Sequence, residues 1–139
     1  MDYRKEFERM MESQTSIALA TAANGNPNVR IVNFYYEPKI GSLYFCTFRD
    51  TQKVAEFHQL PHVAFTTIPT NGEAHVRVKS AIVCKSLTTI EEIKPKFLAK
   101  MPEHIISNPD VLPSLDLIEV LFDLADVVLD FEHMATVVV

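Results

Sequence analysis

Glycine is scarce in this chain, and the places where it occurs constrain the fold most. The 139 residues include three glycines, at positions 25, 41 and 72, and each lies between strand-like runs. Asn24-Gly25 and Asn71-Gly72 are typical of type I′ hairpin turns, because both central residues of such a turn need positive φ. The same scarcity excludes a Gly-rich phosphate loop, and with it a Rossmann or P-loop nucleotide site.

The spacing of apolar residues predicts the elements between these turns. Apolar runs, partly alternating, predict strands over 16–22, 28–36, 42–48, 62–69 and 74–87. A period near 3.6 predicts helices over 2–12, over 51–60 and from about Thr88 to Met101, where Pro95 would kink the helix or restart it. Residues 102–114 hold three prolines and are expected to form a loop. Residues 117–132 are expected to form one or two strands, although their spacing also fits a helix.

These elements predict a mainly β protein with five to seven short antiparallel strands and two or three helices. Such a set favours a small closed barrel, because closure removes exposed strand edges. The length is that of one ordinary domain, so residues 1–139 are expected to form a single domain.

Composition excludes several classes of function. The formal net charge of −5 argues against a broad nucleic-acid interface. No apolar run is long enough to span a bilayer, and the charged N-terminus lacks an apolar signal core, so a cytoplasmic protein is expected. Cys46 and Cys84 are expected to be buried, reduced thiols, since they form neither a CxxC pair nor a metal-ligand spacing.

Two segments hold candidate binding residues. Arg30 lies in the middle of an otherwise apolar strand, where it would either extend from a sheet edge into solvent or point into a cleft and pair with an anion. Thr47, Thr51 and Lys53 surround the expected start of a helix and could converge on a phosphate, although many helices begin with such residues.

Other polar residues favour structural interpretations. His75, Arg77 and Lys79 alternate along a strand, which is typical of a solvated sheet face. His58 and His62 are four residues apart, but Pro61 would break the helix that could align them, so no metal site is expected. No Ser/His/Asp pattern or nucleophile elbow is present.

Taken in order, several segments resemble the pyridoxamine 5′-phosphate oxidase-like, FMN-binding split-barrel family. The resemblance covers about residues 5–87 and is strongest to short bacterial members, those similar to general stress proteins and nitroimidazole reductases. The segments are Ile17-Ala18-Leu19-Ala20-Thr21, Gly25-Asn26-Pro27, Arg30-Ile31-Val32-Asn33-Phe34, Tyr44-Phe45-Cys46-Thr47, Lys53, Pro61 and Val76-Arg77-Val78.

The resemblance implies a six-stranded antiparallel Greek-key split barrel with flanking helices, forming a homodimer with FMN at the interface. Arg30 and Lys53 would bind the FMN phosphate, assisted by Thr51. The other implied contacts are Ile31, Val32 and Asn33 at the ring, Cys46 and Thr47 along the third strand, Gln52 near the phosphate, and His75 beside the flavin.

Three departures from the family pattern limit the implied activity. Gln52 replaces a second phosphate-binding Arg and Tyr35 replaces a Lys that reaches the ring, and the Arg-rich segment that binds the vitamin B6 substrate does not follow. The sequence therefore predicts an FMN-dependent oxidoreductase that uses NAD(P)H or another reductant and a small substrate, not a genuine pyridoxamine phosphate oxidase. A flavin-binding protein without turnover, a barrel that binds haem or a deazaflavin, and a cofactor-free dimerisation domain are the alternatives.

Overall fold

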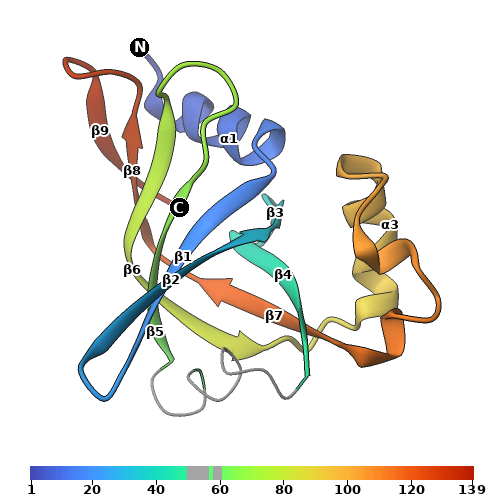
Figure 1. Cartoon of the computed structure of the whole chain (residues 1–139). Coiled ribbons are helices and arrows are strands. Elements are labelled where there is room, and N and C mark those ends of the chain that lie inside the picture. Colours follow the sequence, from blue (N-terminus) through green and yellow to red (C-terminus); the bar gives the residue numbers. More distant parts are fainter. Residues whose placement is uncertain (50–56, 58–60) are drawn as a thin grey trace.

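The computed structural model describes residues 1–49, 57 and 61–139. Two α-helices and nine strands occur among them (Figure 1). They are α1 (Tyr3–Ser13), β1 (Ser16–Ala23), β2 (Asn26–Asn33), β3 (Tyr35–Glu37), β4 (Ser42–Phe48), β5 (His62–Thr67), β6 (His75–Lys85), α3 (Ile90–Lys100), β7 (Leu115–Leu121), β8 (Leu124–Val128) and β9 (Met134–Val138). The helix expected over 51–60 lies outside the described residues, apart from Phe57. No helix in the described part of the chain is long and apolar enough to cross a membrane.

The strands form one antiparallel sheet with the order β2-β1-β5-β6-β7-β4-β3. Strand β6 also pairs with β8, and β8 pairs with β9. The two ends of the path, β2 and β3, follow each other in the chain but do not pair with each other. The split barrel that the resemblance implied is therefore confirmed, and the closed barrel expected from the strand pattern is wrong.

The described residues form nine strands, whereas the resemblance implied six. Two of the expected strand segments are each divided into two strands, and one further strand is present. The strand expected over 28–36 breaks at Phe34, whose ring is fully buried and whose N–H donates to the Thr15 carbonyl at 3.0 Å. The segment 117–132 breaks between β7 and β8, so its interpretation as strands is confirmed and the helix is wrong. Strand β9 was not expected, and the region expected to be a loop holds two short 3₁₀ helices, Ile105–Ser107 and Leu112–Ser114.

One of the two expected hairpin turns forms as predicted. Asn24 and Gly25 have φ of 53° and 79°, as a type I′ turn requires. At the second site Gly72 has positive φ but Asn71 does not, so the type I′ prediction there is wrong. Strands β5 and β6 are joined instead by the longer loop 68–74.

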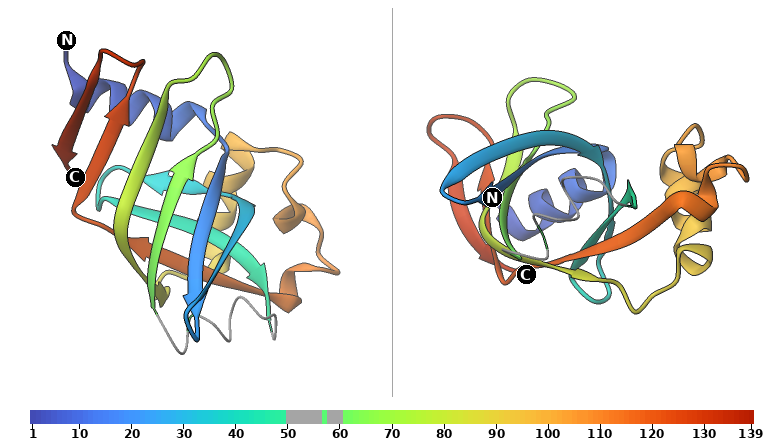
Figure 2. Two further views of the ribbon diagram at one scale, coloured as in Figure 1. Left: turned by 60° about the vertical axis from the view of Figure 1, so that its left-hand side comes forward. Right: turned by 60° about the horizontal axis from the view of Figure 1, so that its bottom comes forward.

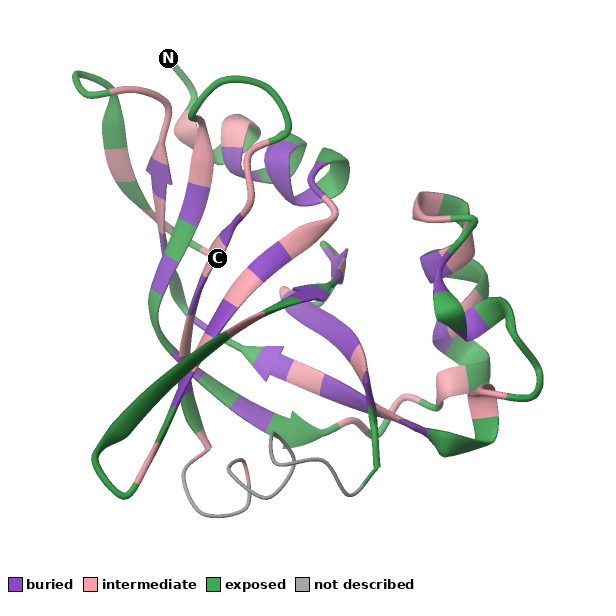
Figure 3. Cartoon of the chain, in the orientation of Figure 1, coloured by how far each residue is buried: buried purple, intermediate pink, exposed green. Residues whose placement is uncertain are grey.

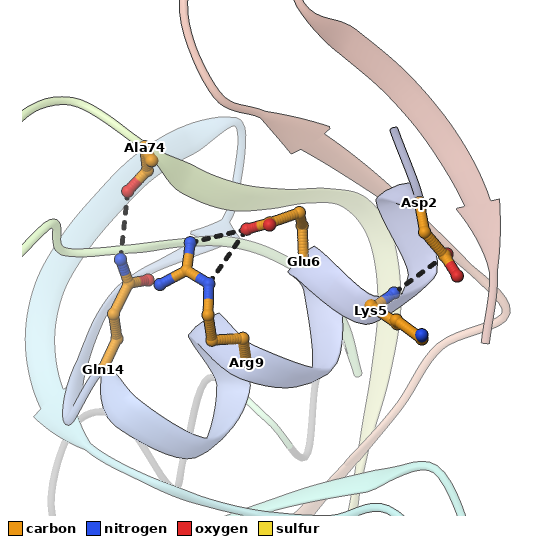
Figure 4. Close-up of polar contacts among 6 residues, drawn as sticks. All are labelled: Asp2, Lys5, Glu6, Arg9, Gln14 and Ala74. Carbon is orange, nitrogen blue, oxygen red and sulfur yellow. Dashed lines mark hydrogen bonds and ion pairs between the residues drawn. The ribbon is translucent and has the colours of Figure 1, made fainter.

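Helix α1 covers one end of the barrel. It begins where expected, because the Asp2 side chain accepts a hydrogen bond from the Lys5 N–H at 3.2 Å, and Gln14 just past its end donates to the Ala74 carbonyl at 3.0 Å (Figure 4). Its buried residues are Phe7, Met10 and Met11, which join the main core. Figure 2 shows the helix across the mouth formed by the strands.

Helix α3 lies at the side of the barrel and has a core of its own. Ile93, Phe97 and Ile106 pack against Tyr44 and Leu117, which project from the outer faces of β4 and β7. The helix starts at the expected cap, where Thr89 accepts from the Glu92 N–H at 3.2 Å. It runs through Pro95 without restarting. Proline removes a bond to the carbonyl four residues earlier, and that carbonyl belongs to the exposed residue Glu91.

Replacement of Phe7 should destabilise the barrel severely. The ring of Phe7 is 1% exposed and makes edge contacts with Tyr36 and Phe122, at centroid distances of 5.5 and 6.5 Å. Phe7→Ala is expected to lower the free energy of unfolding by about 3–5 kcal/mol in urea titration. Phe131→Ala is the matched control, because Phe131 is 89% exposed. Equal losses in both variants would contradict this account of the core.

Acid should destabilise the α3 region through His104. This buried side chain accepts a hydrogen bond at Nδ1 from the Ile106 N–H at 3.0 Å, and burial lowers its pKa. The unfolded chain therefore takes up a proton near pH 6.5 that the folded chain takes up only at lower pH. Stability should be retained above that pH and decrease as the pH falls below it. In His104→Asn, which can still accept from the backbone, the decrease measured by urea titration should be smaller.

Candidate functional site

Strand β2 places its predicted binding residues on two faces of the sheet. Arg30 pairs with Leu19 and Val32 pairs with Ile17, and both β1 partners are fully buried in the core. Directly paired residues share a face, so Arg30 and Val32 are directed into the barrel. Ile31 pairs with Ala18 on the outer face and is 69% exposed.

Asn33 and His75 also lie on the outer face. The Asn33 side chain accepts a hydrogen bond from the Ser16 hydroxyl at 3.0 Å. The Nδ1 atom of His75 lies 2.7 Å from the Glu73 carbonyl oxygen, which can only accept, so Nδ1 carries the proton and Nε2 the lone pair. Strands β1 and β5 separate β2 from β6, so Ile31 and Asn33 lie three strands away from His75 in the sheet.

Strand β4 likewise divides its two predicted residues. Thr47 is buried, and it alternates with Cys46, which packs in the second core beneath α3. Burial raises the pKa of the Cys46 thiol to about 12. Cys84 is exposed on β6, so the expectation that both thiols are buried is wrong for Cys84.

Three of the predicted phosphate-binding residues, Thr51, Gln52 and Lys53, lie outside the described residues. Strand β4 leads toward them and ends at Phe48, at the end of the barrel away from α1 (Figure 1). Just beyond it, Arg49 pairs with Asp116 at 3.0 Å. The described predicted residues therefore form an inward set (Arg30, Val32 and Thr47), an outward set (Ile31, Asn33 and His75) and Cys46 beneath α3, and the structure does not bring them into one pocket.

The alternating cations of β6 form a solvated face, as the sequence predicted. The side chains of Arg77 and Lys79 are 54% and 74% exposed, and each lies near Asp126 of β8, at 3.6 and 3.7 Å. The Thr136 hydroxyl donates to Asp126 at 2.7 Å, and this bond is the largest cause of the lowered pKa of that carboxyl. A shallow groove of about 510 Å³ runs beside these residues at the break between β7 and β8.

A larger cleft, of about 890 Å³, lies elsewhere, between α1, β3 and α3. None of the predicted binding residues lines it. Its lining includes Tyr35 of β3 and two lysines of α3, Lys96 and Lys100. Lys96 pairs with the buried carboxylate of Glu37, and this hydrogen bond holds the pKa of Glu37 below its usual range. The sequence shows that these two lysines are four residues apart, which places them next to each other on one face of a helix. Their position at the cleft depends on how α3 packs against the rest of the protein.

The family of this chain is identified by its similarity to known proteins. A model of the family described as pyridoxamine 5′-phosphate oxidase-like matches residues 10–131. The chain belongs to this family. The predicted resemblance is thus confirmed, and the match extends beyond residue 87 to include α3, β7 and β8. The sequence matches none of the curated proteins with which it was compared.

Solved structures agree on the fold of this family member. The General Stress Protein 26 of Bacillus anthracis superposes with a TM-score of 0.70 and 18% identity, over 99% of this chain and 100% of that one. A fad-binding protein of Mesorhizobium loti gives a TM-score of 0.63 and 15% identity, over 87% and 90% of the two chains. A heme binding protein of Mycobacterium smegmatis gives 0.71 and 11%, over 99% of this chain but only 58% of that one. At these identities the likeness establishes the fold.

The two cysteines should differ sharply in reactivity. A thiol with a pKa near 12 is almost wholly protonated at pH 8, and the thiolate is the reactive form. Cys84 is exposed, although partial burial and the nearby Glu119 also raise the pKa of its thiol. With a disulfide reagent at pH 8, Cys84→Ser should abolish rapid labelling of the folded protein and Cys46→Ser should leave it. Equal labelling rates in the two variants would contradict the burial of Cys46.

Proposed function

We propose that this protein is an FMN-binding flavoprotein that works as a homodimer and reduces a small substrate with electrons from NAD(P)H. The observation that carries the proposal is the family match over residues 10–131, on a fold shared with a fad-binding protein. A bound flavin would supply the redox chemistry, so no side chain needs to act as acid or base.

The donor chemistry of the inward set suits a phosphate-bearing flavin. Arg30 offers a guanidinium from within the barrel wall, and Thr47 offers a hydroxyl on the inner side of β4. Lys53, Thr51 and Gln52 would complete the phosphate contacts, and Ile31 to Asn33 would border the ring. The neutral thiol of Cys46 would contribute packing, because a pKa near 12 leaves no thiolate for electron transfer.

The proposal is tested by the visible spectrum of the purified protein before and after FMN is added and the excess removed. About one FMN per chain is expected. The double variant Arg30→Ala/Lys53→Ala should weaken FMN binding at least a hundredfold, because it removes both cations from the phosphate. Lys85→Ala/Lys94→Ala is the control for the same loss of charge and should bind FMN normally. If the double Arg30/Lys53 variant still binds FMN with wild-type affinity, these residues do not form the phosphate site and this part of the proposal is wrong.

Turnover and assembly need separate measurements. Oxidation of NAD(P)H by the FMN-loaded protein, with nitro compounds or quinones as acceptors, would support a reductase. Bound FMN without NAD(P)H oxidation would favour a flavin-binding protein without turnover. Sedimentation should give the mass of a dimer, and a monomer would contradict that part of the proposal.

Haem binding is the second candidate, supported by the similarity to the heme binding protein of Mycobacterium smegmatis. His75 suits it, because the Glu73 carbonyl holds Nδ1 as the donor and leaves Nε2 free for iron, as is usual for histidine ligands. In that case added haemin should give a bound-haem spectrum that His75→Ala loses, while added FMN is not retained.

A further inference from the structure

Two asparagines of this chain, Asn24 and Asn71, are followed by glycine. An asparagine can lose its side-chain amide when the next backbone nitrogen attacks its Cγ atom, and glycine hinders this attack least because it has no Cβ. The remaining asparagines precede proline, whose nitrogen carries no hydrogen, or the bulky residues valine and phenylalanine. They are Asn26, Asn28, Asn33 and Asn108. The reaction is therefore expected at the two Asn-Gly pairs, and the structure places these pairs in different settings.

Asn24 lies in a hairpin turn that opposes the reaction. The φ angles of Asn24 and Gly25, 53° and 79°, are those of the type I′ turn between β1 and β2. The ladder of the hairpin begins directly beside the turn, with the pair Ala23 and Asn26. Attack on Cγ requires a rotation about ψ of the asparagine, away from the value of about 30° that the turn requires. The reaction at Asn24 would therefore have to disrupt the end of the ladder.

Asn71 lies in the loop 68–74, where no ladder fixes the backbone. Residues 70–73 are exposed, and Figure 3 shows this loop between β5 and β6 at the surface. Within the described part of the chain, neither the Gly72 N–H nor the Asn71 side chain makes a hydrogen bond. A Cβ added at Gly72 would meet no atom within 4 Å. The rotation that brings the Gly72 nitrogen to the Asn71 side chain therefore breaks no contact of the fold.

We propose that Asn71 is a site of selective deamidation, at which the folded protein converts an amide into a carboxylate while Asn24 stays intact. The Gly72 nitrogen forms a bond to Cγ of Asn71, and the bond from Cγ to Nδ2 breaks. The proton of the attacking nitrogen leaves with the amide group as ammonia, and a cyclic imide remains. Water then opens the imide at either carbonyl, which gives aspartate or isoaspartate. Nothing is oxidised or reduced, and water is the one co-reactant.

The product would alter a loop that holds two other parts of the protein. The Ala74 carbonyl accepts a hydrogen bond from the Gln14 side chain at 3.0 Å, just past the end of α1 (Figure 4). The Glu73 carbonyl oxygen lies 2.7 Å from Nδ1 of His75. Deamidation adds a negative charge close to that of Glu73, and isoaspartate also lengthens the backbone by one carbon. The change should therefore reach both the end of α1 and the ring of His75.

The experiment incubates the unaltered full chain at pH 8 and 37 °C and follows its peptides by mass spectrometry over several weeks. Deamidation raises the mass of a peptide by about one dalton, since ammonia is lost and water is gained. In the folded protein, the peptide with Asn71 should convert at least tenfold faster than the peptide with Asn24, because the hairpin must open before Asn24 can react. Labelling by an isoaspartyl methyltransferase should show isoaspartate at the first site.

The same protein unfolded in urea is the matched control. Both Asn-Gly pairs are then without the fold, so their rates should agree within about twofold. Equal rates at the two sites in the folded protein, a faster reaction at Asn24, or an Asn71 amide that stays intact would each overturn the proposal. A preference for Asn71 that persists unchanged in urea would also overturn it, because the fold would then not be its cause.

Discussion

The architecture depends on the pairing of β6 with three other strands. Its length lets it pair with β5 along one edge and with β8 and then β7 along the other. The break at Phe122 and Asp123 lets the chain change direction while both β7 and β8 stay bonded to the same strand. Strand β6 thus joins one wall of the barrel to the β8–β9 hairpin. Along β6 itself, the alternation places Arg77 on the outer face and Val78 in the core.

The alternation of side chains in the barrel wall decides what the candidate residues can touch. Figure 3 shows exposed residues along most of β2, yet the ladder with β1 directs Arg30 inward between exposed neighbours. On β4 the same alternation separates Thr47 from Cys46, and α3 covers the latter. A flavin that contacts residues on both faces would have to lie at an end of the wall, where the strands stop, and the segment with Lys53 follows the end of β4.

The region between β6 and β7 covers one side of the barrel. Helix α3 covers the outer face of β4 and β7 with an apolar core, and its other side forms the cleft with α1. Lys100 joins the two helices through the carbonyls of Met11 and Phe34. The same contact that holds α3 in place therefore leaves a partly buried cation facing the cleft.

Much of the fold was predictable from the sequence, because it depends on local chemistry. The Asp2 and Thr89 caps, the Asn24-Gly25 turn and the period of two in β1, β4 and β6 act over a few residues each. The sequence also determined the family, through residues spread along the first strands. The tertiary structure alone decided which face each candidate residue occupies, that β2 and β3 form the two ends of the open sheet, and that Cys84 is exposed while Cys46 is not. It alone brought Lys100 against residues of α1 and β2–β3. Strand register and helix docking depend on contacts between residues far apart in the chain, and a local pattern carries no information about which distant partner a side chain will meet.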